Sequence, residues 1–135
     1  MTNTSLAQSY LAKARARLKA LIVLEQEGAY SDVVREAQEI VELALKGMLR
    51  QVGVEPPKWH DVGRMLQEHA VRFPAEVASE LADLAEISGW LRKEREFSFY
   101  GDIDFIPTEQ YGRAEAARAI EGARRVVSAA EKVIR

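Results

Sequence analysis

The sequence predicts an all-α protein, an antiparallel up-and-down four-helix bundle with one short extra helix. Three observations predict this class. Apolar residues recur at alternating steps of three and four over four long stretches, the spacing that lines one face of an α-helix. Short connections separate these stretches, and four long helices joined in this way favour antiparallel packing. Hydrophobic residues make up 47% of the chain, which argues against disorder.

The first helix is expected at residues 4–27, where an apolar stripe is followed by Gly28 as a stop signal. The stripe consists of Ala7, Leu11, Ala14, Leu18 and Leu21. Four basic residues lie between the apolar positions, and they are more typical of a solvated helix face than of a nucleic-acid-binding patch. These residues are Lys13, Arg15, Arg17 and Lys19.

Ser31 is predicted to cap the second helix, because its side-chain oxygen can accept hydrogen bonds from the free amides. Asp32 would then lie against the positive end of the helix dipole, and Gly53 would end the helix. We expect this helix to be the most buried of the four, with an inner stripe of Val33, Ala37, Val41, Ala44 and Met48. Glu42 and Lys46 lie four residues apart in the favourable order, which predicts an exposed ion pair.

An irregular connector and the short extra helix are expected next. Pro56 and Pro57 predict the connector over residues 54–59, because proline biases the preceding residue towards extended backbone. His60 and Asp61 are expected to open the short helix, which reaches about residue 70. His60 can donate or accept a hydrogen bond at a helix start, so a structural role and a binding role both stay open.

Pro74 is predicted to occupy the first turn of the third long helix, where its missing amide would have been unpaired. This helix is expected to run without a break to Phe99, and Gly89 predicts a close approach of another helix. Thr108 is predicted to cap the last helix. Its stripe of largely small residues, which allow close packing, comprises Tyr111, Ala116, Ile120, Ala123, Val127, Ala130 and Ile134.

The chain length predicts a single domain, residues 1–135, which is large enough to bury a core without metal or disulfide cross-links. The net charge of -2 and the pI near 5.8 provide no global basic field for non-specific binding to nucleic acid. The chain has no Cys, which agrees with a reducing compartment. It shows neither an apolar leader nor eighteen apolar residues in a row. We therefore expect a cytoplasmic protein that is neither exported nor membrane-spanning.

Metal and cofactor motifs are absent from the sequence. There is no P-loop, no paired-glycine dinucleotide fingerprint and no HExxH, and the lack of Cys excludes thiolate zinc sites. His60 and His69 lie nine residues apart without carboxylates at helical spacing, which makes a poor metal site. Asp102 and Asp104 are able to bind a cation, but carboxylates beside Gly in a loop are more typical of turn geometry. The prediction is no metal and no cofactor.

A charged and aromatic segment holds the candidate site. Residues 91–111 read LRKEREFSFYGDIDFIPTEQY, and the helical pattern ends inside them at a Gly. Arg92 and Arg95 are near neighbours on a helical surface, and Arg forms bidentate bonds to phosphate. Tyr100 and the phenylalanines before it are able to stack on a base. The residues alone leave two interpretations open: an anion site, or aromatics that complete the bundle end or a dimer contact.

Four stretches of the chain resemble, in order and spacing, the HEPN family, named for nucleotide-binding domains of higher eukaryotes and prokaryotes. They are the helical stretch VREAQEIVELALKGML at residues 34–49, Gly53 with PPKWHDV at residues 56–62, Arg95 to Asp102 with Pro107 and Tyr111, and the Ala-rich last helix. The resemblance covers nearly the whole chain. It implies an up-and-down helical bundle, frequent homodimerisation, and a partnership with a small nucleotidyltransferase in a toxin–antitoxin-like pair.

One departure from the family pattern concerns catalysis. Many toxins of the family cleave RNA with an Arg that is followed four to six residues later by His. Here Arg95 is followed by Glu-Phe-Ser-Phe-Tyr-Gly-Asp, and no His occurs after His69. The imidazole that would act as general acid or base is therefore missing, and the phenol of Tyr100 is a weak substitute at neutral pH. The resemblance then favours the non-nuclease branch.

The predicted function is that of a non-catalytic HEPN protein that binds a nucleotide or a nucleotidyltransferase partner. Arg95 would hold phosphate and Tyr100 would stack, with Lys46 as a weaker candidate. The predicted site residues are Arg92, Arg95, Tyr100, Asp102, His60, Lys46 and Tyr111. Two alternatives remain: a toxin-like endoribonuclease with a substituted acid or base, for which nucleic acid is the substrate, and a purely oligomeric interaction module.

Overall fold

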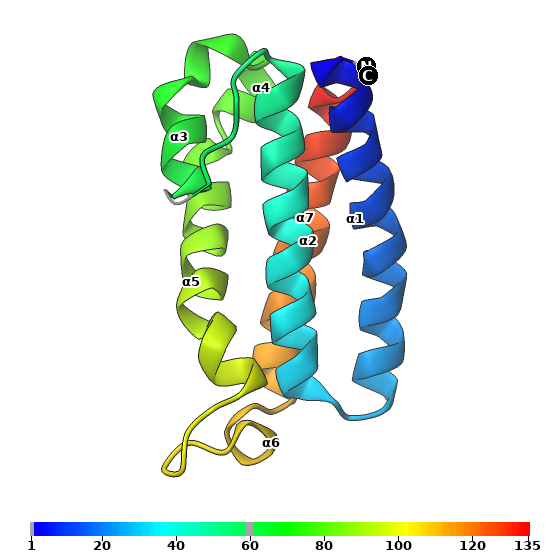
Figure 1. Ribbon diagram of the computed structural model, residues 1–135, viewed down its shortest axis with the longest axis vertical. Coiled ribbons are helices and arrows are strands. Elements are labelled where there is room, and N and C mark those ends of the chain that lie inside the picture. Colours follow the sequence, from blue (N-terminus) through cyan, green and yellow to red (C-terminus); the bar gives the residue numbers. More distant parts are fainter. Residues whose placement is uncertain (1, 59–60) are drawn as a thin grey trace.

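A computed structural model describes residues 2–58 and 61–135, and four long helices form its frame. These are α1 (Asn3–Gln26), α2 (Tyr30–Gln51), α5 (Leu81–Phe99) and α7 (Arg113–Val133). They alternate in direction, and both chain ends lie at the same end of the bundle (Figure 1). Within the described residues no strand forms beyond an isolated bridge between Asp102 and Phe105. The predicted all-α, up-and-down bundle is confirmed.

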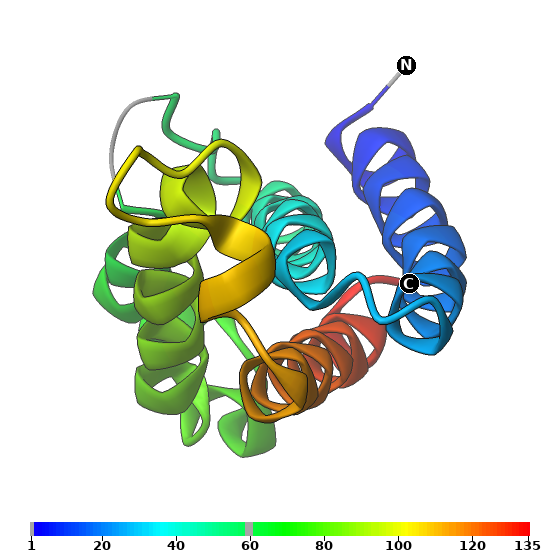
Figure 2. The same ribbon diagram turned by 90° about the horizontal axis from the view of Figure 1, so that it is seen from below.

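The bundle is flattened around a central pair of helices. Viewed along its length, α2 and α7 lie at the centre, and α1 and α5 lie on opposite sides of them (Figure 2). The central helices bury most of their apolar residues, whereas α1 buries Ala7, Leu11, Ala14 and Leu21. The prediction that the second helix is the most buried of the four is confirmed for the described residues, since α2 has more buried residues than α1, α5 or α7. None of the helices in the described part of the chain is apolar over a length that could cross a bilayer.

The connections contain more short helical segments than the one predicted. They are α3 (Val62–Glu68), the 3-10 turn η1 (Ala70–Arg72), α4 (Ala75–Ala78) and α6 (Pro107–Gln110). The Asp61 carboxylate caps α3 by accepting a hydrogen bond from the Gly63 amide at 3.0 Å. The predicted unbroken third helix is wrong, because the chain turns at residues 79–80, where the Ser79 hydroxyl donates to the Glu76 carbonyl at 2.9 Å.

Both predicted side-chain caps of the long helices are wrong. Ser31 lies buried inside α2, which starts at Tyr30 without a side-chain cap, because the inward stripe of the helix includes this position. Thr108 belongs to the single turn of α6, after which extended backbone redirects the chain. The last long helix begins instead after Gly112, whose amide donates to the Glu115 carboxylate at 2.6 Å.

Helices approach closely at glycines other than the predicted one. Gly89 has no neighbouring atom within 4 Å of where a Cβ would lie, so the predicted approach there is wrong. A Cβ on Gly63 would lie 2.7 Å from the Cα of Ala85, which brings α3 against α5. Gly101 ends α5 in the left-handed region, with φ 69°, as its place after the aromatic run predicts. This turn leads α5 into the loop below the bundle.

Candidate ligand-binding groove between helices α2 and α5

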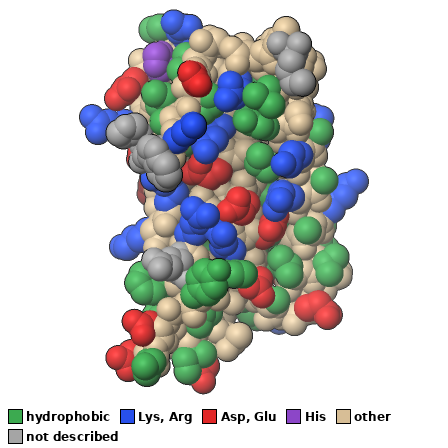
Figure 3. Space-filling view, in the orientation of Figure 1, with side chains coloured by type: hydrophobic (Ala, Val, Ile, Leu, Met, Phe, Trp, Pro, Cys, Tyr) green, Lys and Arg blue, Asp and Glu red, His purple; other side chains and the backbone are tan. Residues whose placement is uncertain are grey.

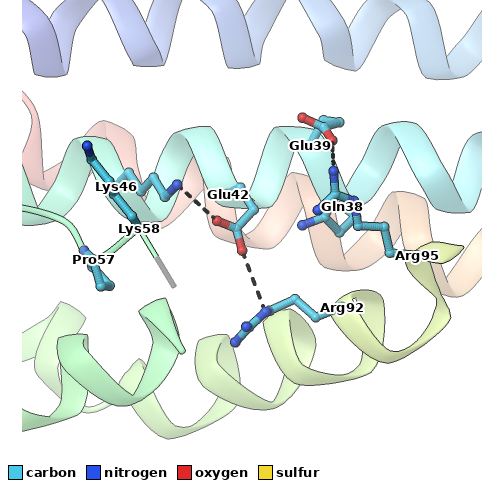
Figure 4. Close-up of a pocket in the computed structure, with 8 residues that line it drawn as sticks. All are labelled: Gln38, Glu39, Glu42, Lys46, Pro57, Lys58, Arg92 and Arg95. Atoms are coloured by element: carbon cyan, nitrogen blue, oxygen red, sulfur yellow. Dashed lines mark ion pairs between the residues drawn. The ribbon is translucent and has the colours of Figure 1, made fainter. Parts of the chain in front are cut away.

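A groove runs along one face of the bundle between α2 and α5. Its upper part is a hollow of about 380 Å³ lined by Gln38, Glu39, Glu42, Lys46, Pro57, Lys58, Arg92 and Arg95 (Figure 4). Its lower part is a hollow of about 470 Å³ lined by Arg35, Arg92, Arg95, Phe99 and Tyr100. The two hollows are neighbours that share Arg92 and Arg95 in their linings, and we call them together the α2–α5 groove.

Helix α2 supplies one wall of the groove through a polar stripe beside its apolar stripe. Steps of three, one, three and four residues place this stripe on one helical face. Its members are Arg35, Gln38, Glu39, Glu42 and Lys46. The spacing is visible in the sequence, but Lys46 is the one residue of this stripe that the sequence analysis included in the predicted site. The sequence shows a polar stripe next to the core stripe of this helix, but it does not show that the stripe faces α5 rather than solvent.

Helix α5 supplies the opposite wall near its C-terminal end. Arg92 and Arg95 lie three residues apart on adjacent turns and face α2 across the groove (Figure 4). Below them, α5 ends at Phe99 and exposes Tyr100. Helix α5 and the residue that follows it thus present two guanidinium groups and then two aromatic rings along the same groove.

Cations outnumber carboxylates along the described walls of the groove. Five cations line it, namely Arg35, Lys46, Lys58, Arg92 and Arg95, against two carboxylates, Glu39 and Glu42. Figure 3 shows Lys and Arg side chains along the middle of this face with acidic side chains between them, and hydrophobic side chains gathered below. The groove is therefore locally positive although the whole chain carries a net charge of -2.

The ion pairs that hold the two α5 arginines are long. Arg92 lies 4.0 Å from Glu42 and 3.4 Å from Asp61, and Arg95 lies 3.6 Å from Glu39. The Arg95 side chain is 53% exposed. Hydrogen bonds between Arg and carboxylate are normally about 2.7–2.9 Å long, so these contacts are electrostatic rather than hydrogen-bonded. The guanidinium groups remain accessible from the groove.

Two further carboxylate contacts lie within α2. Lys46 pairs with Glu42 at 3.5 Å, which confirms the predicted pairing, but the side chains are 33% and 20% exposed rather than fully exposed, and both line the groove. Glu39 pairs with Arg35 at 3.0 Å as well as with Arg95. Each groove carboxylate is therefore shared between two cations, which leaves the wall with unbalanced positive charge.

Gln38 is the most buried polar side chain of the groove. It is 3% exposed, and its Oε1 has no hydrogen-bond partner. Most buried polar atoms in proteins are paired, and Arg35 Nη1 is the other groove-lining atom that is buried without a hydrogen bond, although it forms an ion pair with Glu39. The sequence prediction did not include it.

Aromatic rings border the lower end of the groove. Phe99 and Tyr100 pack edge to face with their centroids 4.8 Å apart, and the Tyr100 side chain is 78% exposed. The Arg35 guanidinium lies over the Phe99 ring, 5.4 Å from its centroid. This arrangement offers an exposed ring beside cations, which suits stacking of a flat ligand group.

The structure brings together four of the seven predicted site residues, namely Lys46, Arg92, Arg95 and Tyr100. His60 lies outside the described residues. Asp102 is not among the groove-lining residues: it forms a turn in which its amide and carbonyl both pair with Phe105 at 2.9 Å. Its carboxylate accepts from the Ile103 amide at 2.6 Å, which is the turn role that its place beside Gly is typical of.

Tyr111 also lies away from the groove lining. Its ring is buried and packs edge to face with Phe105 at 5.7 Å. Its hydroxyl donates to the Glu94 carboxylate at 2.6 Å. Burial, reinforced by this hydrogen bond and the charge of Glu94, raises the pKa of Tyr111 well above its usual range. These contacts describe a residue that fixes the 107–111 segment against α5.

Comparisons with known proteins agree with this architecture. TT1696 from Thermus thermophilus is similar at 25% identity and a TM-score of 0.74, over 93% of this chain and 95% of that chain. ST0689, described as an archaeal HEPN homologue, has the same fold at 23% identity and a TM-score of 0.74, over 96% and 98% of the two chains. No curated protein sequence matches. The model of the HEPN domain matches residues 7–133, and the chain therefore belongs to the HEPN family.

Proposed function

We propose that the α2–α5 groove binds a nucleotide and that the protein is a non-catalytic HEPN subunit. One observation carries the proposal: Arg92 and Arg95 border both hollows and are held by ion pairs of 3.4 to 4.0 Å, longer than hydrogen bonds. Two accessible guanidinium groups on adjacent helical turns suit the oxygens of a phosphate chain.

Exchange of carboxylate for phosphate is energetically reasonable at this site. Solvent-exposed ion pairs contribute about 0–1 kcal/mol each, so releasing Arg95 from Glu39 costs little. A phosphate that makes bidentate, charge-assisted hydrogen bonds gains more than these long contacts provide. Lys46 and Lys58 add charge at the upper end, where the distal phosphates would lie.

The aromatic end of the groove supports the choice of a nucleotide over a free phosphate. Stacking of a base on an aromatic side chain contributes about 1–3 kcal/mol. Tyr100 offers an exposed ring in the lower hollow, next to the arginines that would hold the phosphates. A ligand with a flat ring at one end and phosphates at the other matches this order of residues.

The absence of a nearby acid or base supports a binding role rather than RNA cleavage. The sequence contains no His after His69, and the described lining of the groove contains none. Each of the two lining carboxylates is paired with two cations. In the alternative, a toxin-like endoribonuclease, purified protein cleaves RNA and Arg95→Ala does not. Intact RNA after incubation with the wild type excludes that alternative.

We also propose that the lower end of the bundle is a protein contact, used in a homodimer or by a small nucleotidyltransferase partner. The support is an exposed apolar group near the groove mouth, formed by Phe97, Phe99, Tyr100, Ile103 and Ile106. Light scattering of the wild type and Ile103→Ser tests the dimer, because Ile103 is 90% exposed in one chain. A monomeric wild type contradicts the dimer, and co-purification with a nucleotidyltransferase tests the other partner.

A titration with ATP tests the proposed ligand. We expect saturable binding by the wild type and a loss of roughly tenfold or more for Arg95→Ala, since a hydrogen bond to a charged group contributes about 1.5–3 kcal/mol. Arg15→Ala is the matched control, because Arg15 is also 53% exposed but pairs with Glu131 on the opposite side of the bundle. Absence of binding, or equal binding by wild type and Arg95→Ala, contradicts the proposal. In that case the aromatic end acts as an oligomer contact alone.

A further inference from the structure

The Glu39 carboxylate marks a lower anion position in the groove. It lies between two guanidinium groups, 3.0 Å from Arg35 on its own helix and 3.6 Å from Arg95 on α5. Both arginines also line the aromatic hollow. Because the same guanidinium groups bind carboxylate and phosphate, this pair of arginines can hold one phosphate beside a base that stacks on Tyr100.

The Glu42 carboxylate marks an upper anion position on the same face of α2. It lies 3.5 Å from the Lys46 ammonium and 4.0 Å from the Arg92 guanidinium, and Figure 4 shows it between these two cations. Lys58 lines the same hollow from the connector that precedes α3. The upper position is therefore surrounded by cations on both walls and can hold a second phosphate.

The two positions follow one another along the groove because α2 and α5 run antiparallel and in register here. Arg95 faces Glu39 across the groove. Arg92, three residues earlier on α5, faces Glu42, three residues later on α2. Three residues of helix advance by about 4.5 Å, so the positions are roughly that far apart along the helix axes. A chain of linked phosphates that starts at the lower position reaches the upper one, whereas a single phosphate occupies one position.

We infer that the groove selects nucleotides that carry a chain of phosphates over nucleoside monophosphates, and that Lys46 determines this selection. The inference rests on the proposed nucleotide binding. Arg92 and Arg95 line both hollows and so serve a short and a long chain alike, whereas Lys46 lines the upper hollow alone. Arg92 is also held by Asp61 at 3.4 Å, while Glu42 is the partner of Lys46 among the described residues. The Lys46 ammonium, a compact charge with three donors, is therefore available to the outer phosphates.

Calorimetric titration of the full chain with ATP and with AMP tests the inference. We expect the wild type to bind ATP at least roughly tenfold more tightly than AMP, the effect of one further charge-assisted hydrogen bond. Lys46→Met keeps an unbranched side chain and removes the charge. It should lower the affinity for ATP roughly tenfold and change that for AMP by less than about threefold. Lys46→Arg restores the charge and should restore the preference for ATP.

Lys132→Met is the matched control. Lys132 lies on α7, is 43% exposed and pairs with Glu80 at 3.7 Å, which resembles the pair of Lys46 in length and exposure. It lines neither hollow. The variant loses the same charge, so it measures how far net charge alone favours the more highly charged nucleotide. It should keep the wild-type ratio of ATP to AMP affinity, and circular dichroism checks that each variant folds.

The outcomes separate this inference from the proposed function. If the wild type binds AMP as tightly as ATP, selection by the phosphate chain is overturned and nucleotide binding stands. A wild-type preference that persists in folded Lys46→Met, or that falls equally in Lys132→Met, overturns the role of Lys46. If the wild type binds neither nucleotide, the proposed function itself fails, and the inference fails with it.

Discussion

The Arg95 guanidinium on α5 lies 3.6 Å from the Glu39 carboxylate on α2, directly across the groove. Glu39 is also 3.0 Å from Arg35 on its own helix, so one carboxylate serves two arginines. The contact links the walls of the groove without filling it, and it leaves the Arg95 side chain half exposed. In the free protein the Glu39 carboxylate therefore pairs with Arg95, and a ligand phosphate would compete with it for this guanidinium.

Neutralising this carboxylate should strengthen anion binding. We predict that Glu39→Gln binds ATP roughly two- to tenfold more tightly than the wild type, because phosphate no longer competes with a charge beside Arg95. The free energy of unfolding should change by less than about 1 kcal/mol, since the ion pairs of Glu39 are partly exposed. Glu131→Gln, which removes the partner of Arg15 on the far side, is the control. Weaker binding by Glu39→Gln would show that the carboxylate itself contacts the ligand.

Replacing Gln38 should stabilise the protein. An unpaired buried acceptor costs about 1–3 kcal/mol, and an apolar side chain of the same length avoids that cost. We predict that Gln38→Met raises the free energy of unfolding by about 1 kcal/mol, measured by urea denaturation. A decrease of this size would instead indicate that Gln38 holds the helix packing together.

Tyr111 should matter for stability and not for binding. Tyr111→Phe removes the hydrogen bond to Glu94 and is predicted to cost about 1 kcal/mol of unfolding free energy, with unchanged affinity for ATP. A large loss of ATP affinity in a folded Tyr111→Phe variant would show that Tyr111 contributes to ligand binding.

The same tyrosine predicts a pH dependence. Its pKa is raised in the folded state by burial and by Glu94, so between about pH 10 and that raised pKa the folded state keeps a proton that the unfolded state releases. Stability contributed by Tyr111 is therefore present below about pH 10 and falls as the pH rises further. The stability difference between wild type and Tyr111→Phe should shrink above that pH. A constant difference would contradict the assignment.

Two glycines provide a paired test of the helix packing. Gly63→Ala places a Cβ 2.7 Å from the backbone of Ala85, and we predict a loss of about 1–3 kcal/mol from this overpacking. Gly89→Ala meets no atom within 4 Å in the middle of α5, so it should gain about 0.5–1 kcal/mol. Denaturant midpoints of the two variants should therefore move in opposite directions. If both midpoints shift in the same direction, the close packing of α3 against α5 at Gly63 is contradicted.

Much of the fold was predictable because apolar spacing reports which face of each helix is buried. The four long helices, and their ends at Gly28, Gly53 and Gly101, follow from local rules that act within a few residues. The failures concern residues whose role depends on other elements. Ser is a favourable residue type for a helix cap, but the Ser31 side chain is buried in the folded protein. The turn after Ser79 contains no Gly or Pro that would mark it in the sequence.

The candidate site was predicted from one wall only. Arg92, Arg95 and Tyr100 stood out because charge and aromatic residues cluster in one segment. Gln38 and Glu39 did not, because nothing in a single sequence says that the polar stripe of α2 faces α5 rather than solvent. Pairing of distant helix faces is a property of the packed bundle, and only the structure supplies it.

The most direct test of the account is amide chemical-shift mapping by NMR while ATP is added to the wild type. We predict that the largest shifts fall on α2 between Arg35 and Lys46 and on α5 between Arg92 and Tyr100, the two walls of the groove. Amides of α1, on the other side of the bundle, should change little. Shifts concentrated on α1 and α7, or no shifts at saturating ATP, would contradict the claim that this groove binds a nucleotide.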